Sequence, residues 1–160
     1  MERMIRGRRV AWSRGSALWL VVSVASAHEY RHTEDGVPLP AVETPGDIRT
    51  TDTGETCVPG AAKRARDVSQ ATKDRVRRLY GVRVRGRHEI DHLIPLAIGG
   101  SNDLRNLWPQ AYEPSPGALE KDRLELYLYH AVCKGRLTLP VAQACIRTDW
   151  YACWMQWGRP

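Results

Sequence analysis

The central stretch of the chain, residues 88–110, reads HEIDHLIPLAIGGSNDLRNLWPQ and combines chemically reactive residue types with turn residues. It places Asp91 directly before His92 and continues with a proline, two glycines and two asparagines. Charged and apolar residues alternate over residues 83–91, which predicts a strand that leads into this stretch. Residues 106–108 predict a short return strand that the following proline ends. Because neighbours on a regular strand point to opposite faces, the backbone must bend near Asp91 for both side chains to serve one site.

The residue types of this stretch suit phosphodiester hydrolysis. The carboxylate of Asp91 can bind a hard divalent cation, and a neutral His92 can take a proton from water. The side-chain amide of Asn106 can hold the histidine loop and fix the orientation of the ring. A structural salt link is the weaker alternative, because an acid and an imidazole have no obvious packing role in a glycine-rich loop. Asn102 follows Ser101 in a turn and is predicted to be a turn or cap residue.

Helical patterns flank the central stretch. They predict helices over residues 73–80 with Thr72 as the cap, over residues 117–134, and from about Pro140 to about Trp157. Three tryptophans lie on one face of the last helix, at positions 150, 154 and 157. Such a stripe is more typical of a core than of a surface on which bases stack.

The chain has four cysteines, at positions 57, 133, 145 and 153. An even number in an exported chain favours disulfides, and the absence of a Cys-x-x-Cys spacing disfavours a structural zinc site. Of the three possible pairings we predict Cys57–Cys133 with Cys145–Cys153. The second bridge requires a break in the last helix, because eight residues of straight helix separate two Cα atoms by about 12 Å.

The N-terminal residues predict export. Residues 1–27 combine a basic start, a short apolar run and a small-residue cleavage site after Ala27, the pattern of a secretory signal peptide. An uncleaved anchor is the alternative, although the run falls short of the roughly 20 apolar residues that span a bilayer. We therefore expect a periplasmic or secreted protein with no stable membrane association after cleavage. Residues 28–56 predict an extended or disordered leader, which leaves 57–160 as the folded domain.

Charge is concentrated in one segment of the mature chain. Without the five arginines and Glu2 of the signal, 19 basic and 17 acidic residues remain, a net charge of +2. Residues 63–87 hold ten basic and two acidic residues, the footprint of a surface that grips a polyanion, with a solvated helix face as the alternative. The residues that we expect to contact phosphate are Arg75, Arg78, Arg85, Arg87 and, from the later helix, Lys121, which could instead pair with Glu125 one turn away.

The central stretch also resembles a known family. The string Glu89-Ile90-Asp91-His92-Leu93-Ile94-Pro95-Leu96, followed by Gly99-Gly100-Ser101-Asn102 and Asn106-Leu107, resembles the core of HNH nucleases. It is especially similar to small exported bacterial HNH proteins that continue with Trp-Pro-Gln and a later Lys-Asp-x-Leu-Glu, here Lys121-Asp122-Arg123-Leu124-Glu125. The resemblance covers roughly Cys57 to Trp150. It implies an α+β fold with a ββα-metal (HNH) hairpin-helix core and additional flanking helices.

By matching position, the resemblance makes Asp91 a metal ligand, His92 the general base, Asn106 the asparagine that braces the loop, and Glu89 a supporting acid. The family's third motif residue, a His or Asn on the following helix and a second metal ligand, has no clean match. Counting back three residues from Lys121 reaches Ala118, which cannot bind a metal. We expect Asp122 to take this role, with Glu113, Glu120 and Glu125 as alternatives.

Together these expectations favour one function over two alternatives. The chain is expected to be a metal-dependent HNH endonuclease acting on phosphodiester bonds in DNA, with RNA as a further candidate substrate. Mg²⁺ is the expected cofactor, and Mn²⁺ or Zn²⁺ are alternatives. Because nothing resembles a base-reading module, we expect little sequence specificity. The first rival, motivated by Ala118, is a non-catalytic nucleic-acid-binding module on a degenerate HNH fold; the second is a plain disulfide-rich structural domain.

Overall fold

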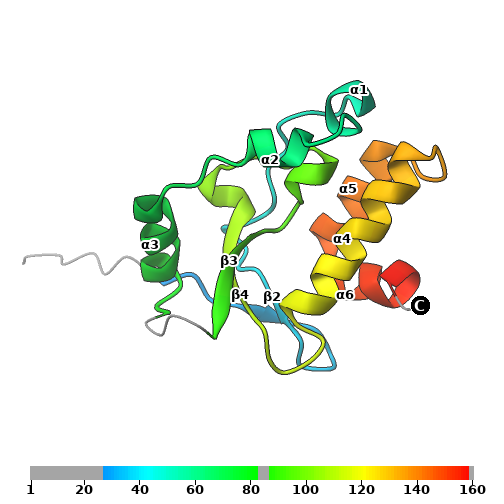
Figure 1. The fold of residues 1–160 in the computed structure, drawn as a ribbon. Helices are drawn as coiled ribbons and strands as arrows, with labels where there is room; N and C mark the ends of the chain where they lie inside the picture. The colour runs from blue at the N-terminus through cyan, green and yellow to red at the C-terminus, as the bar shows by residue number, and fades with distance from the viewer. Residues whose placement is uncertain (1–26, 83–86, 159–160) are drawn as a thin grey trace, which may run out of the picture.

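The computed structural model describes residues 27–82 and 87–158 of the 160-residue chain (Figure 1). Within these residues the protein is a mixed α+β fold with two small antiparallel sheets and several helices. The first sheet pairs β1 (Arg31–His32) with β2 (Pro38–Leu39), and the second pairs β3 (His88–His92) with β4 (Leu107–Ala111). The predicted signal peptide lies outside the described residues, except for Ala27, and so does Arg85.

The β3–β4 hairpin is the centre of the fold. Its register runs from His88 opposite Ala111 to His92 opposite Leu107, so β4 continues through Pro109. The prediction that the strand ends at this proline is therefore wrong. In a two-stranded sheet each strand has a free edge, and a proline is tolerated where its nitrogen faces away from the partner strand. The Pro109 carbonyl also faces away from β3, since it accepts a hydrogen bond of 2.8 Å from the Tyr30 hydroxyl.

Two short helical turns, η1 (Leu96–Ile98) and η2 (Leu104–Asn106), shape the loop between β3 and β4. Gly100 lies between them at a close backbone approach, because a Cβ there would be 1.8 Å from the Ile94 carbonyl oxygen. Gly99 has a φ of 85°, and a Cβ there would be 2.3 Å from the Thr50 carbonyl oxygen. The two glycines thus allow the loop to fold back on itself and to contact the N-terminal segment.

Helix α4 (Ala118–Cys133) follows β4, which confirms the predicted helix over residues 117–134. It packs beside α5 (Leu139–Thr148), and Figure 1 shows the two side by side. The predicted last helix is broken at Asp149, which has an extended backbone and caps α6 (Trp150–Cys153) through its carboxylate. The chain then ends its described part in η3 (Trp154–Gly158).

Helix α3 (Gln70–Leu79) begins three residues earlier than predicted, because Ser69 and not Thr72 is its cap. The Ser69 hydroxyl accepts a hydrogen bond of 3.1 Å from the Thr72 backbone N–H. Two further helices, α1 (Thr53–Thr56) and α2 (Ala61–Ala65), were not predicted. Each is only one turn or slightly longer, which is too short for a periodic pattern to develop.

Residues 28–56 are ordered, and the folded unit begins before Cys57. The segment is extended over much of its length, but Val37, Leu39 and Ala41 belong to the main hydrophobic core. The Tyr80 hydroxyl donates to or accepts from the buried Thr44 hydroxyl at 2.6 Å. A few well-packed apolar side chains therefore fix this segment, although it has no apolar period that the sequence could reveal.

Both predicted disulfides are confirmed. Cys57–Cys133 joins the end of α1 to the end of α4, and Cys145–Cys153 spans the helix break with a Cα–Cα distance of 5.4 Å. The tryptophan stripe is part of the core, as predicted: Trp150 and Trp154 are buried, and the partly buried Trp157 packs against the core cluster. None of the helices in the described residues is long and apolar enough to cross a membrane.

Candidate active site

A buried lysine connects α4 to the end of β3. The ammonium of Lys121 donates to Asp91 Oδ2 at 2.6 Å, to the His92 carbonyl at 2.8 Å and to Glu125 Oε1 at 2.5 Å. Only 1 % of its side chain is exposed, and all three of its N–H donors have an acceptor. Lys121 is therefore not available to a phosphate, which corrects its prediction as a nucleic-acid contact. The alternative pairing with Glu125 is present, in a buried position.

The contacts of Lys121 with Asp91 and Glu125 shift the pKa values of Lys121 and Glu125. Burial alone would lower the pKa of Lys121, but the attraction of Asp91 and Glu125 outweighs it and holds the pKa above the usual value. The lysine is therefore charged. Burial raises the pKa of Glu125 against the attraction of Lys121.

Two further acids complete a carboxylate cluster, which we define as Glu89, Asp91, Asp122 and Glu125. Partial loss of solvation, and then repulsion by Asp91, raises the pKa of both Glu89 and Asp122. Glu89 shares a face of β3 with Asp91 and accepts a hydrogen bond of 3.3 Å from the Tyr112 hydroxyl. Four carboxylates thus surround one lysine, and the raised pKa values of Glu89, Asp122 and Glu125 indicate that the negative charge is not fully compensated.

His92 is held at the other side of the loop. Its ring is buried and its Nε2 lies 3.0 Å from Asn102 Oδ1. Asn102 Nδ2 in turn donates to the Ala65 carbonyl at 2.8 Å, which ties the ring to the end of α2. Burial is the main cause that lowers the pKa of His92, so the ring is neutral at neutral pH. A neutral imidazole is the form that can accept a proton.

Asn106 holds the main chain of the loop, and its side-chain hydrogen bonds go to backbone groups and not to the His92 ring. It is completely buried, with Oδ1 accepting from Ile94 N at 2.9 Å and Nδ2 donating to the carbonyls of Ile94 and Ser101 at 2.9 and 2.8 Å. Two asparagines therefore share the bracing contacts that were predicted for Asn106 alone. Asn106 braces the loop backbone, whereas Asn102 holds the histidine ring, a role that its place in a turn did not indicate.

The structure places the candidates for the second metal ligand in different environments. Ala118 is buried in the first turn of α4. Glu120 caps that helix through a 2.8 Å hydrogen bond from Gly117 N, and Glu113 is exposed in the preceding loop. Asp122 is the candidate that is exposed and also interacts with Asp91. Within residues 27–82 and 87–158, no group of three or more His, Cys, Asp or Glu side chains is arranged to hold a metal ion.

A basic residue that the sequence did not single out lies near the histidine. The charge of Arg66, directly after α2, adds to burial in lowering the pKa of His92 and, with Lys121, partly offsets the raised pKa of Asp122. Arg75 and Arg78 are exposed on α3, and Arg87 is exposed just before β3. Arg66 was part of the predicted basic segment, but nothing in the sequence placed α2 against the loop.

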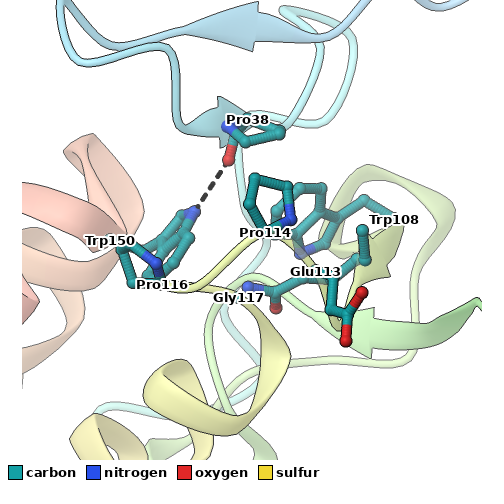
Figure 2. A pocket seen from close by; sticks show the side chains of 9 residues that line it. Pro38, Trp108, Glu113, Pro114, Pro116, Gly117 and Trp150 are labelled. Atoms are coloured by element: carbon teal, nitrogen blue, oxygen red, sulfur yellow. Dashed lines mark hydrogen bonds between the residues drawn. The ribbon is translucent and has the colours of Figure 1, made fainter.

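Figure 2 shows a narrow cavity between β2, β4 and the start of α6. Trp108, Trp150 and three prolines line it, and Trp150 Nε1 donates to the Pro38 carbonyl at 3.1 Å. Its volume is about 10 Å³, which is room for roughly one water. A nucleotide cannot enter it, so this cavity is not a nucleotide site.

Comparison of the chain with family models, with curated proteins and with solved structures gives no match. The chemistry inferred for the site therefore depends on its own residues and their contacts.

Proposed function

We propose that the chain is a metal-dependent endonuclease that hydrolyses phosphodiester bonds in DNA with little sequence specificity, and that β3, β4 and α4 form a ββα-metal core. RNA is a further candidate substrate. The observation that carries this proposal is the juxtaposition, at one end of a hairpin, of a neutral, firmly held His92 and an incompletely neutralised carboxylate cluster. A general base beside an anionic metal site is the combination that this reaction requires.

The donor atoms of the cluster suit Mg²⁺. Lys121 binds only Oδ2 of Asp91, so Oδ1 of the same carboxylate can face a cation, and Asp122 supplies a second carboxylate nearby. Mg²⁺ commonly uses one or two protein carboxylates, several waters and substrate phosphate oxygens, whereas zinc sites take three or more protein ligands. We infer that Asp91 and Asp122 would hold Mg²⁺, with Mn²⁺ as a substitute. A bound ion would neutralise charge on the phosphate and stabilise the leaving oxygen.

The chain's own residues have separate tasks in this proposal. His92 removes a proton from the attacking water, and Asn106 keeps the loop backbone in place beneath it. Glu89 supports the negative potential at the site. The positive charges that would attract the phosphate backbone come from Arg66, Arg75, Arg78, Arg85 and Arg87.

A non-catalytic nucleic-acid-binding module is the second candidate function. The contact between Lys121 and Asp91 favours it, because the ammonium already supplies part of the positive charge that a metal would bring. Ala118, at the position of a family ligand, favours it as well. This module would bind nucleic acid through its arginines without cleaving it.

We further propose that the protein is exported to the periplasm or beyond. Two disulfides join all four cysteines, a use of cysteine that is common in oxidising compartments. The N-terminal signal pattern points the same way.

The proposed function is tested by incubating the oxidised protein with circular plasmid and linear RNA in the presence of Mg²⁺, Mn²⁺, Zn²⁺ or a chelator. We expect cleavage that requires Mg²⁺ or Mn²⁺ and that falls by about 10²- to 10⁴-fold in His92→Ala, the usual effect of losing a general base. His130→Ala, which changes an exposed histidine on α4, is the matched control. If wild type and His92→Ala are equally inactive with every metal while both retard the plasmid, the binding module replaces the nuclease.

A further inference from the structure

The side-chain amide of Asn102 bridges the His92 ring and the Ala65 carbonyl. These two partners show which end of the amide is the oxygen and which is the NH₂. A backbone carbonyl can only accept hydrogen bonds, so the group that Asn102 turns toward the Ala65 carbonyl, 2.8 Å away, must be its NH₂. The carboxamide oxygen of Asn102 is then the atom that faces His92 Nε2 at 3.0 Å. The orientation of the side-chain amide is thereby fixed by chemistry.

The orientation of the Asn102 amide also fixes the tautomer of the His92 ring. A carboxamide oxygen only accepts, so Nε2 of His92 must carry the hydrogen in this contact. A neutral imidazole has one N–H and one bare nitrogen, which leaves the lone pair on Nδ1. Among the described residues, Nδ1 of His92 has no hydrogen-bond partner, and it is not one of the buried unpaired atoms.

The main chain around Asn102 is anchored from several directions. The preceding residue, Ser101, donates from its backbone N–H to the Asp47 carbonyl at 3.0 Å and from its hydroxyl to Asp47 Oδ2 at 2.7 Å. Its carbonyl accepts from Asn106 at 2.8 Å. Asn102 therefore has little freedom to turn away from the ring, as a residue that orients another side chain requires.

We propose that Asn102 is a positioning residue that fixes His92 as the Nε2–H tautomer and so assigns Nδ1 as the nitrogen that accepts the proton. The tautomer assignment stands on the hydrogen bonds alone, and its catalytic consequence rests on the proposed nuclease function. In that reaction water gives a proton to Nδ1, its oxygen bonds to phosphorus, and the bond from phosphorus to the leaving oxygen breaks. The imidazolium keeps its Nε2–H bond to Asn102 and later releases the Nδ1 proton to the leaving oxygen or to solvent.

The alternative is that Asn102 merely caps α2 by binding the Ala65 carbonyl. Two variants separate these roles. Asn102→Asp retains an oxygen acceptor for Nε2–H but loses the donor to Ala65, whereas Asn102→Ala loses both contacts. Asp103→Ala is the matched control, because it removes a side-chain bond to Arg105 in the same turn without a contact to His92.

The experiment records the ¹⁵N shifts of the His92 ring in the oxidised full protein at a pH where the ring is neutral, and then measures cleavage kinetics. We expect a protonated Nε2 and a bare Nδ1 in the wild type, in Asn102→Asp and in Asp103→Ala. In Asn102→Ala the two tautomers should mix. We also expect kcat to fall by about 10- to 100-fold in Asn102→Ala with KM unchanged, the size of effect seen when the partner of a functional histidine is removed.

A wild-type ring protonated on Nδ1 would overturn the inference, and so would an unchanged tautomer in Asn102→Ala. The wild-type spectrum alone shows which ring nitrogen is protonated. The inference can therefore be overturned even if a variant does not fold. The ring shifts also separate this inference from the proposed function. An inactive wild type whose Nε2–H tautomer depends on Asn102 would support the positioning role and reject only the nuclease.

Discussion

The two sides of the candidate site hold their reactive side chains by different kinds of contact. On the carboxylate side, Asp91 is paired with the buried charge of Lys121, an internal cation from α4. On the histidine side, which consists of His92, Asn102 and the end of α2, the contacts are neutral hydrogen bonds. The difference indicates that charge dominates the carboxylate side, whereas directional hydrogen bonds dominate the histidine side.

Removing the internal cation should have the largest effect. Lys121→Met leaves Asp91 and Glu125 without their partner, and breaking a buried ion pair commonly costs about 3–5 kcal/mol. We expect a loss of this size in the free energy of unfolding, measured with urea. Mg²⁺ should restore part of it if the cluster binds the ion, because binding to the folded state alone stabilises that state. Lys134→Met, an exposed lysine just after α4, is the control and should leave stability unchanged.

The disulfide between Cys57 and Cys133 links the segment carrying α1 and α2, next to the histidine side, to α4. We expect its removal to lower the free energy of unfolding. These cysteines are 76 residues apart, and a loop of that length corresponds to about 4 kcal/mol of lost stabilisation when the bridge is removed. Replacing both by serine should lower stability more than replacing Cys145 and Cys153, whose separation is 8 residues. Equal losses in urea unfolding would show that loop length does not govern the two bridges.

The carboxylate side should show a conflict between stability and metal binding. Because partial loss of solvation, and then repulsion by Asp91, raises the pKa of Asp122, its charged form disfavours the folded state. Asp122→Asn should therefore raise the free energy of unfolding at neutral pH, by less than about 1 kcal/mol for this exposed group. The gain should disappear as the pH falls below both the folded and the unfolded pKa, where the wild-type carboxyl is protonated too. A gain that grows on acidification would contradict the assignment.

The smallest effect should come from the arginines around the histidine side. Arg66→Ala should weaken plasmid binding and reduce the slope of log K against log salt by about 0.9 if the side chain contacts one phosphate. Arg78→Ala, on the exposed face of α3, is the comparison. Equal losses of plasmid binding in the two variants would mean that the polyanion contacts the whole basic segment. Unchanged binding in Arg66→Ala would mean that the polyanion does not contact the protein beside His92.

Local patterns were sufficient for part of this architecture. The order β3, loop, β4, α4 and the presence of a break in the last helix follow from periodicity, glycines and the geometry of a disulfide across a helix. Asn106 was expected to brace the loop, and its partners Ile94 and Ser101 are indeed close to it in the sequence. These features depend on residues near one another in the chain.

The remaining contacts could not be predicted because they depend on tertiary packing. Lys121 reaches Asp91 across 30 residues, and Asn102 reaches Ala65 across 37. Leu124 and Leu128 mark the buried face of α4, and Lys121 lies on it one turn earlier. Lysine is almost never fully buried unless it is paired, and the sequence does not show that Asp91 supplies the partner. Residues 28–56 resembled a disordered leader for a similar reason, because only the assembled core reveals how Val37 and Leu39 are buried.

Binding of Mn²⁺ tests the central claim most directly, and the loss of the free-ion electron paramagnetic resonance signal measures it. We predict that one Mn²⁺ binds per chain and is displaced by excess Mg²⁺, with binding abolished in Asp91→Asn and weakened in Asp122→Asn. Glu113→Gln, which changes an exposed carboxylate outside the cluster, should bind like the wild type. Absence of binding at millimolar Mn²⁺, or binding that persists in Asp91→Asn, would contradict a metal site built on the carboxylate cluster.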